Sequence, residues 1–222
     1  MALNNHRELG TTRLIDSFFI DSGFERSPNE PTLYVNKQGN FDFLVVCLYV
    51  DDIIHMGSNE VLVEEFKTCM MHKFEMLDLG LLHYFLGVEG VQCEEGIFIS
   101  QQKYGVNLLK KFNMLKCKPA PIPMNVNEIL ISEDGIGFAN ARHYRSVVGG
   151  LIYLSHTRPD ISFSISIISK FMHNPSLQHY GAAKQILRYV AGMTNHGIWY
   201  TKKEDFRLLG YSDNDWPGYK ED

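Results

Sequence analysis

The sequence predicts an α+β fold in which antiparallel sheets pack against helices. An apolar run rich in β-branched and aromatic residues spans 41–50, ends at two aspartates and then resumes, which indicates a β-hairpin. Elsewhere, apolar residues recur at helical spacing in several segments. The chain has 222 residues, of which 45% are hydrophobic and 21% charged, and this composition excludes a disordered, collagen-like or coiled-coil protein.

The first hundred residues contain both helix and strand signals. A helix with an apolar face precedes Gly23, and Ser58 or Asn59 can cap a second helix that we expect to pack on the sheet. The turn from Cys93 to Gly96 joins two strands in a second hairpin. The expected elements are a helix at 12–21, strands at 32–35 and 41–50, the helix after Asn59, a hairpin of 84–91 and 96–100, and a short helix from Ser100 to Phe112.

The second half of the chain is predicted to be mainly helical. A proline-rich segment, Pro119 to Pro123, and the polar stretch up to Asn140 indicate a linker or an extended crossing. Within the helices that follow, Thr157 is expected to act as a cap while Asp160 faces the amides of a helix N-terminus. The predicted elements are helices at 141–155, 157–172 and 176–191, which resemble a small bundle, and strands at 197–201 and 207–211.

Charge is distributed unevenly along the chain, although the net charge is only −5. Residues 51–100 hold 2 Lys and Arg against 10 Asp and Glu, whereas residues 101–200 hold 11 against 4. The acidic total argues against a protein that depends on phosphate contacts, yet the basic second half could lie along a polyanion. A solvated basic face explains the same charges, so both interpretations stay open.

Neither a thiolate metal site nor a membrane segment is indicated. The four cysteines are widely spaced and form no CxxC pair, so we expect reduced thiols. The longest apolar run, 43–50, is much shorter than the roughly 18 residues that a membrane span needs, and the N-terminal residues are polar. We therefore expect an intracellular protein without a signal peptide or a transmembrane segment.

The adjacent carboxylates Asp51 and Asp52 are the strongest chemical feature. At a hairpin tip they repel each other unless a cation or a partner offsets their charge, which favours a divalent metal. Phosphoryl transfer with two metals needs carboxylates on a rigid sheet, and a hairpin provides one. For an isolated pair of aspartates, a polar β-turn without function is the commoner explanation, so the surrounding motifs have to decide.

Several motifs together resemble reverse transcriptases of the Ty1/copia retrotransposon type. YVDDII at 49–54 is similar to the active-site hairpin of that family. Five further segments resemble the family in order and spacing: LDLGLLHYFLGVE (77–89), GIFISQQKY (96–104), KPAPIPM (118–124), YRSVVGGLIYLSHTRPDISF (144–163) and ILRYVAGMTNHGIWY (186–200). The resemblance implies a partial right-hand polymerase palm in 1–100, a thumb and connection in 101–195, and the first strands of an RNase H-like domain in 196–222.

The resemblance also implies roles for individual residues. Asp51 and Asp52 match catalytic carboxylates that bind Mg²⁺ or Mn²⁺, and Asp213 in GYSDNDW matches the first metal-binding carboxylate of RNase H. The implied activity is two-metal RNA-directed DNA polymerisation on an RNA or DNA primer–template with dNTPs. Primer or template contacts are implied for Tyr49, Val50, Leu79, Gly80, Lys103, Lys110 and Lys111, although a solvated helix explains the lysines equally well.

The sequence departs from the family pattern in three respects. No segment resembles the upstream palm strand with its further aspartate or the arginine-containing fingers helix, and only nine residues follow Asp213. His55 stands where an aromatic or aliphatic residue is usual. We therefore expect little or no polymerisation from this chain, and unpaired sheet edges that call for a protein partner. The alternative is a non-catalytic remnant that at most binds nucleic acid or a protein partner.

Overall fold

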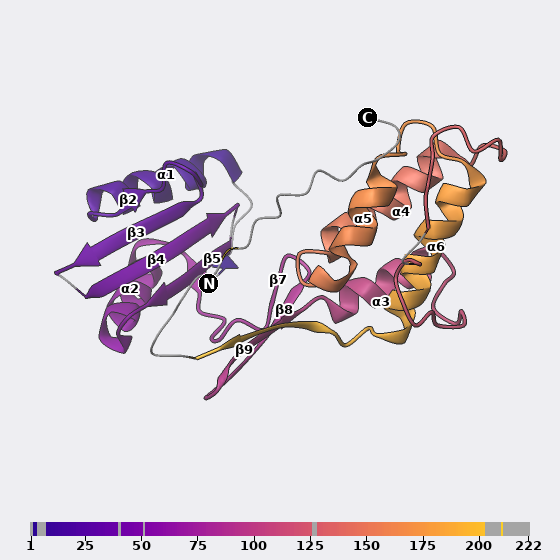
Figure 1. Ribbon diagram of the computed structural model, residues 1–222. Coiled ribbons are helices and arrows are strands. Elements are labelled where there is room, and N and C mark those ends of the chain that lie inside the picture. The colour runs from indigo at the N-terminus through magenta and orange to yellow at the C-terminus, as the bar shows by residue number, and fades with distance from the viewer. Residues whose placement is uncertain are drawn as a thin grey trace. The chain divides into compact units, whose positions relative to one another are not determined.

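The computed structural model describes residues 2–3, 8–39, 41–50, 52–125, 128–202 and 210, and Figure 1 shows their helices and strands. The chain divides into two compact units, residues 1–82 and 83–222. The expected mixture of helices and antiparallel sheets is confirmed. The division at 82/83 differs from the boundaries expected at 100 and 195, because the hairpin before residue 100 and the strand at 197–201 pair with each other. None of the described helices is long and apolar enough to cross a membrane.

The first unit is a six-stranded sheet with two helices. Its strand order is β2-β3-β4-β5-β1-β6 and the pairs are antiparallel. The predicted helices and strands of this region are present, with their ends shifted by a few residues. In chain order the elements are β1 (Ala2–Leu3), α1 (Glu8–Asp21), β2 (Glu25–Arg26), β3 (Leu33–Gln38), β4 (Asp42–Tyr49), β5 (Asp52–Gly57), α2 (Glu60–Lys73) and β6 (Met76–Leu77).

Asn59, one of the two residues predicted as a cap, is the N-cap of α2. Its side-chain oxygen accepts hydrogen bonds from the backbone N–H groups of Val61 at 2.8 Å and Leu62 at 3.3 Å, which satisfies two amides that have no partner inside the helix. The other candidate, Ser58, donates to the carboxylate of Asp42 at 3.0 Å. Ser58 therefore joins the start of β4 to the end of β5.

Both helices of the first unit pack on the same face of its sheet. Every second residue of a strand points to the same face of the sheet, and so do residues that pair across two strands. The register of β4 and β5 therefore defines one buried side. The core on that side comprises Ile15 and Phe19 of α1, Leu44, Val46 and Leu48 of β4, Ile53 of β5, and Phe66 and Met70 of α2. Burial contributes about 1.5–3 kcal/mol per side chain of this size, so this cluster fixes the hairpin against the helices.

The second unit combines a four-stranded antiparallel sheet, in the order β10-β9-β8-β7, with a helical bundle. The predicted strand at 197–201 is present, but it pairs over its full length with β9, almost a hundred residues earlier. The strand predicted at 207–211 lies outside the described residues, apart from Gly210. The elements are β7 (Tyr84–Phe85), β8 (Val88–Cys93), β9 (Gly96–Ser100), α3 (Gln102–Lys111), α4 (Ala141–Leu154), the 3₁₀ helix η1 (Pro159–Ile161), α5 (Ser162–Ser169), α6 (Leu177–Gly192) and β10 (Gly197–Thr201).

The predicted bundle is formed by α3, α4, α5 and α6 around one apolar core. The apolar stripes of these helices face this core, as the helical spacing requires, with most of their residues buried and a few, such as Tyr104 and Tyr180, partly buried. Representative core residues are Leu109 of α3, Val147 and Leu151 of α4, Ile168 of α5, and Ile186 and Val190 of α6.

The expected capping role of Thr157 is wrong. The chain enters η1 through Arg158, and the hydroxyl of Thr157 instead lies 3.0 Å from the side-chain amide of Gln101, in a buried contact. Asp160 forms a two-point ion pair with Arg158 at 2.9 and 2.7 Å. A buried guanidinium competes for this carboxylate more strongly than neutral amides do.

The segment after the prolines is fixed to the start of α6. Ser176 caps α6 and its hydroxyl bonds to Asp134, while its backbone N–H donates to Nδ1 of His179 at 2.9 Å. The other ring nitrogen of His179 lies 3.1 Å from the carbonyl oxygen of Ile131, and the ring stacks on Phe171 with centroids 3.9 Å apart. Ile131 and Asp134 of the predicted linker are thus held by hydrogen bonds at the start of α6.

Candidate active site

The hairpin predicted around the two aspartates is formed by β4 and β5. Tyr49 pairs with Asp52, which leaves Val50 and Asp51 as the two residues of the tip. Asp51 itself lies outside the described residues, as does Asp213. Val50 has a φ of 55°, a left-handed conformation that is rare for a β-branched residue and costs about 1–3 kcal/mol. Strain of this kind concentrates at functional sites, which agrees with a specialised tip.

Asp52 lies on the face of the sheet that is opposite to the helices. Asp52 pairs with Tyr49, so the two side chains share a face. Tyr49 is adjacent to the buried Leu48 and therefore points to the opposite side, so Asp52 and Tyr49 both face away from the apolar core. On the same face, Tyr49 is exposed, and so is Met56 of β5. The carboxylate of Asp52 is thus placed where a ligand could approach without displacing α1 or α2.

The described residues do not by themselves complete a metal site. Nowhere in the described ranges do three or more His, Cys, Asp or Glu side chains group in a way that could hold a metal ion. Asp52 is a suitable oxygen ligand for a hard cation such as Mg²⁺, but one carboxylate does not define a coordination shell. The geometry therefore places one candidate ligand, and no catalytic step follows from it alone.

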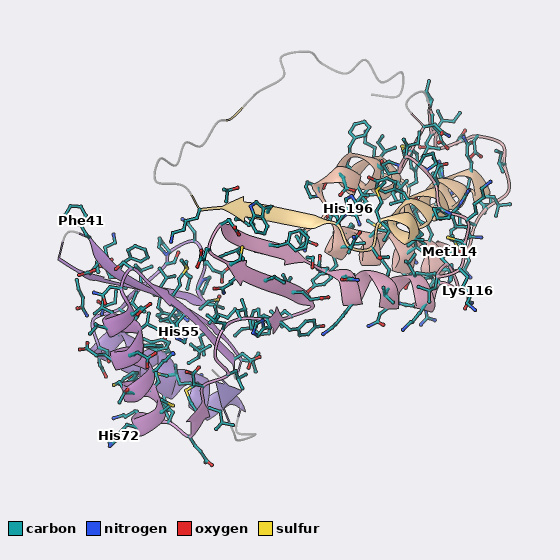
Figure 2. The ribbon with its side chains drawn as sticks, turned by 90° about the horizontal axis from the view of Figure 1, so that it is seen from below. Phe41, His55, His72, Met114, Lys116 and His196 are labelled. Carbon is teal, nitrogen blue, oxygen red and sulfur yellow. The ribbon has the colours of Figure 1, made fainter. Side chains whose placement is uncertain are left out.

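His55 of β5 lies beside the site in sequence but on the other face of the sheet. It pairs with the buried Val46, and its ring lies against Phe66 of α2 with centroids 5.4 Å apart. Figure 2 labels His55 among the side chains of the first unit. Burial lowers the pKa of His55, and its buried Nδ1 has no hydrogen-bond partner among the described residues. His55 is thus half-buried beside the core and does not contribute to the face of Asp52.

Leu79 and Gly80 lie in an exposed apolar stretch that continues to Leu82. Leu79 and Leu81 are both about two-thirds exposed, at 66% and 65%. Gly80 has a φ of 72°, which glycine adopts without strain, and its N–H donates to the carboxylate of Asp78 at 3.0 Å. Asp78 is also paired with Lys67 of α2 at 3.1 Å. These contacts hold the turn against α2 and leave the leucines accessible.

The three candidate lysines all belong to α3, in the second unit. This helix contains no acidic residue, so its Lys103, Lys110 and Lys111 form a basic stretch. The Nζ atom of Lys103 lies 5.1 Å from the ring centroid of Tyr84, a cation–π distance. Lys111 lines a cavity of about 290 Å³ with Tyr104 and Gly150, between α3 and α4. The hairpin and the lysines thus lie in different units.

A sequence model described as "Reverse transcriptase (RNA-dependent DNA polymerase)" matches residues 9–126, which is more than half of the chain. The chain belongs to the reverse transcriptase family. The match covers all of the first unit except its first eight residues, and it extends through the β7–β9 hairpin region and α3. The resemblance drawn from YVDDII and its neighbouring motifs is therefore confirmed.

Several curated proteins are similar to this reverse transcriptase chain. The Retrovirus-related Pol polyprotein from transposon RE1 of Arabidopsis thaliana is 37% identical over 93% of the chain, and that from transposon TNT 1-94 of Nicotiana tabacum is 30% identical over 91%. An uncharacterized mitochondrial protein of Arabidopsis thaliana is 37% identical over 79% of the chain and 72% of its own length. The chain spans only 14% and 16% of the two polyproteins. No solved structure gives a significant match.

Proposed function

We propose that this chain is part of an RNA-directed DNA polymerase of a copia-type Pol polyprotein. In this proposal residues 1–100 form a partial palm, residues 101–195 form the thumb and connection, and residues 196–222 begin an RNase H-like domain with Asp213 as its first carboxylate. The observation that carries the proposal is the β4–β5 hairpin, in which Tyr49 and Asp52 pair next to the tip and lie on the face of the sheet opposite to α1 and α2. The family to which the chain belongs supports the choice of reaction.

In the proposed site, Asp51 and Asp52 would hold Mg²⁺ or Mn²⁺, since carboxylate oxygens are the ligands that such cations prefer. When bound, a pair of these cations supplies electrostatic stabilisation for nucleotidyl transfer from a dNTP. Tyr49 and Val50 would lie at the primer end, and the accessible stretch around Leu79 and Gly80 would contact the primer. Lys103, Lys110 and Lys111 would contact backbone phosphates, which gives affinity without sequence preference.

A second function is favoured by one specific observation. Helix α3 presents three lysines and contains no acidic residue. A chain that binds nucleic acid, or a protein partner, without catalysing nucleotidyl transfer would show this pattern. In this second candidate function, α3 is the binding element and the hairpin tip catalyses no reaction.

Primer extension on an RNA template with Mg²⁺ or Mn²⁺ separates the two candidates. The variants Asp51→Asn and Asp52→Asn remove the proposed ligands, and Asp21→Asn is a matched control because Asp21 is exposed at the end of α1, away from the hairpin. Extension that disappears in the first two variants and persists in the control supports the polymerase. Binding without extension by the folded chain supports the second candidate. Extension that survives both substitutions contradicts the proposed site.

A further inference from the structure

The chain between the proline-rich segment and α4 lies against the beginning of α6, and we call residues 130–139 of it the strap. Two backbone hydrogen bonds connect them. The N–H of Ala139 donates to the carbonyl oxygen of Pro175 at 2.8 Å, and the N–H of Leu177 donates to the carbonyl oxygen of Gly137 at 2.9 Å. The strap thus closes over the residues at which α6 starts.

Few apolar side chains hold the strap in place. Leu130 is its one buried residue, and it joins the core of the helical bundle. The larger apolar side chains farther along are exposed, Ile136 at 46% and Phe138 at 74%. Segments with little buried apolar surface open at a low cost in free energy. The polar contacts of the strap therefore decide how easily it opens.

These polar contacts meet at His179, in the first turn of α6, whose side chain is completely buried. Its Nδ1 accepts a hydrogen bond from the backbone N–H of Ser176 at 2.9 Å, and its Nε2 lies 3.1 Å from the carbonyl oxygen of Ile131 in the strap. A backbone N–H only donates and a carbonyl oxygen only accepts. Nδ1 must therefore be without a proton and Nε2 must carry one, so the two contacts together require the neutral ring.

Protonation of His179 is incompatible with these contacts. A second proton, on Nδ1, would point at the N–H of Ser176, which is also a donor, and the hydrogen bond between them would be lost. Stacking on Phe171, with the two ring planes inclined by only 12°, restrains the ring from tilting away. A buried charged ring without an acceptor for each proton is strongly disfavoured. Opening of the strap brings both nitrogens into contact with water, so protonation favours the open form.

Asp134 of the strap is the charged group that acts on the imidazole, and its carboxylate accepts a hydrogen bond from the hydroxyl of Ser176. The charge of Asp134 raises the pKa of His179, but burial lowers this pKa by more. Other titratable groups on the packed elements are exposed or bound to other partners: Glu133, His143, Lys170 and His173 are exposed, Tyr144 and Arg145 donate to the carbonyl oxygens of Ile168 and Met172, and Lys184 lies against the ring of Tyr180.

We propose that the strap is a pH-sensitive closure, held against α6 while His179 is neutral and released when the imidazole is protonated. In the open form His179 titrates like an exposed histidine, at about pH 6.5. Because the closed form requires the neutral ring, the ratio of open to closed molecules should rise about tenfold between pH 7.5 and pH 5.5. Release uncovers the first turn of α6 and the part of the core beside Leu130. None of these residues belongs to the proposed polymerase site, so the inference is independent of the proposed function.

Hydrogen exchange followed by NMR on the full chain tests the strap. The amides of Ala139 and Leu177 report its opening, and the amide of Leu151, in the middle of α4, reports the bundle. Protection factors corrected for the intrinsic pH dependence of exchange are compared at pH 7.5 and pH 5.5. We expect the protection of Ala139 and Leu177 to fall about tenfold. Their exchange should not depend on low concentrations of urea, in contrast to that of Leu151, because a local opening exposes little surface.

Two substitutions make the test specific to His179. In His179→Gln the new side chain can still accept from the N–H of Ser176, as glutamine does in a capping box, but it does not ionise. The protection of Ala139 and Leu177 should then be the same at both pH values. His173→Gln is the matched control, because His173 is an exposed histidine of the same region. This control should keep the tenfold fall of the parent protein.

Four outcomes overturn the inference. The first is a protection of Ala139 and Leu177 that does not change with pH, and the second is an equal fall in His179→Gln. The third is exchange of both amides with the protection and urea dependence of Leu151, since the strap would then open only when the whole unit unfolds. The fourth concerns the parent protein alone and needs no variant: nitrogen-15 NMR at pH 7.5 should find the imidazole proton of His179 on Nε2, and a proton on Nδ1 would remove the basis of the inference.

Discussion

Arg158 and Asp160 form an ion pair in which the arginine is the more buried partner. We therefore predict that replacing Asp160 destabilises the second unit more than replacing Arg158. The side chain of Arg158 is only 2% exposed, whereas that of Asp160 is 32% exposed. The guanidinium donates twice to Asp160 and once, at 2.7 Å, to the carbonyl oxygen of Met193 just after α6. Burial disfavours ionisation of Asp160, but the hydrogen bonds and charge of Arg158 outweigh it and lower the pKa of Asp160.

The exposures give the expected magnitudes. Removing one partner of a buried pair costs about 3–5 kcal/mol because a charge remains buried without compensation. Water can reach part of the space near Asp160, so for Asp160→Asn we expect a loss of about 2–3 kcal/mol. Arg158→Met keeps most of the volume and leaves only a partly exposed carboxylate, so its expected cost is about 1–2 kcal/mol. The double variant should cost no more than Arg158→Met alone, since the unpaired charge is then absent.

Urea unfolding followed by Trp199 fluorescence in the Trp216→Phe background measures this difference in the second unit. Because Trp199 lies in β10, its fluorescence follows the unfolding of the second unit alone, and the two units need not unfold together. The reasoning about the buried charge is refuted if Asp160→Asn stays within about 0.5 kcal/mol of the parent, or if Arg158→Met is the more damaging change.

Three further predictions concern pH, capping and strand pairing. Burial lowers the pKa of His179 from its ordinary 6.5, against the opposing charge of Asp134. Below about pH 6.5 the unfolded chain then binds more protons than the folded chain. The contribution of His179 to the free energy of unfolding of the second unit should therefore be constant above that pH and decrease below it. In urea titrations at several pH values, His179→Gln should reduce this pH dependence. Asn59→Ala should cost about 1 kcal/mol in thermal unfolding of the first unit, and Asn59→Asp should restore it. Gly197→Ala places a Cβ 2.3 Å from the carbonyl oxygen of Ile99, so hydrogen exchange of the β9 and β10 amides should accelerate. Unchanged exchange would contradict the β9–β10 pairing. Gly149→Ala is the control, because its Cβ meets nothing within 4 Å.

Local signals in the sequence were sufficient for most elements and for the family. The β4–β5 hairpin is specified by its strand composition and two-residue tip, and α2 by the capping side chain of Asn59. Helical spacing alone located the bundle helices α4 and α6. The motif YVDDII and its companions indicated the reverse transcriptase family before any geometry was known. These features depend on residues close together in the chain, so periodicity and turn chemistry define them.

The faces of the strands could not be read from the sequence. The run from Leu44 to Leu48 is apolar at every position, so alternation does not say which side is buried. Packing against α1 and α2 decided that Val46 faces the core, and with it that Asp52 faces the opposite side. Likewise, the strand register places His55 on the same face as Val46, where its half-buried ring packs against Phe66 at the edge of the core.

The partner of β10 was also decided only by the tertiary structure. GIWYT predicts a strand, but nothing near residues 197–201 specifies that they pair with Gly96–Ser100. This pairing brings the ring of Trp199 beside that of Phe98. The buried Arg158, at the start of η1, donates to the carbonyl oxygen of Met193 at the end of α6, just before β10. Strand propensity is a property of a short segment, whereas the choice of partner depends on which distant surfaces the folded bundle brings together.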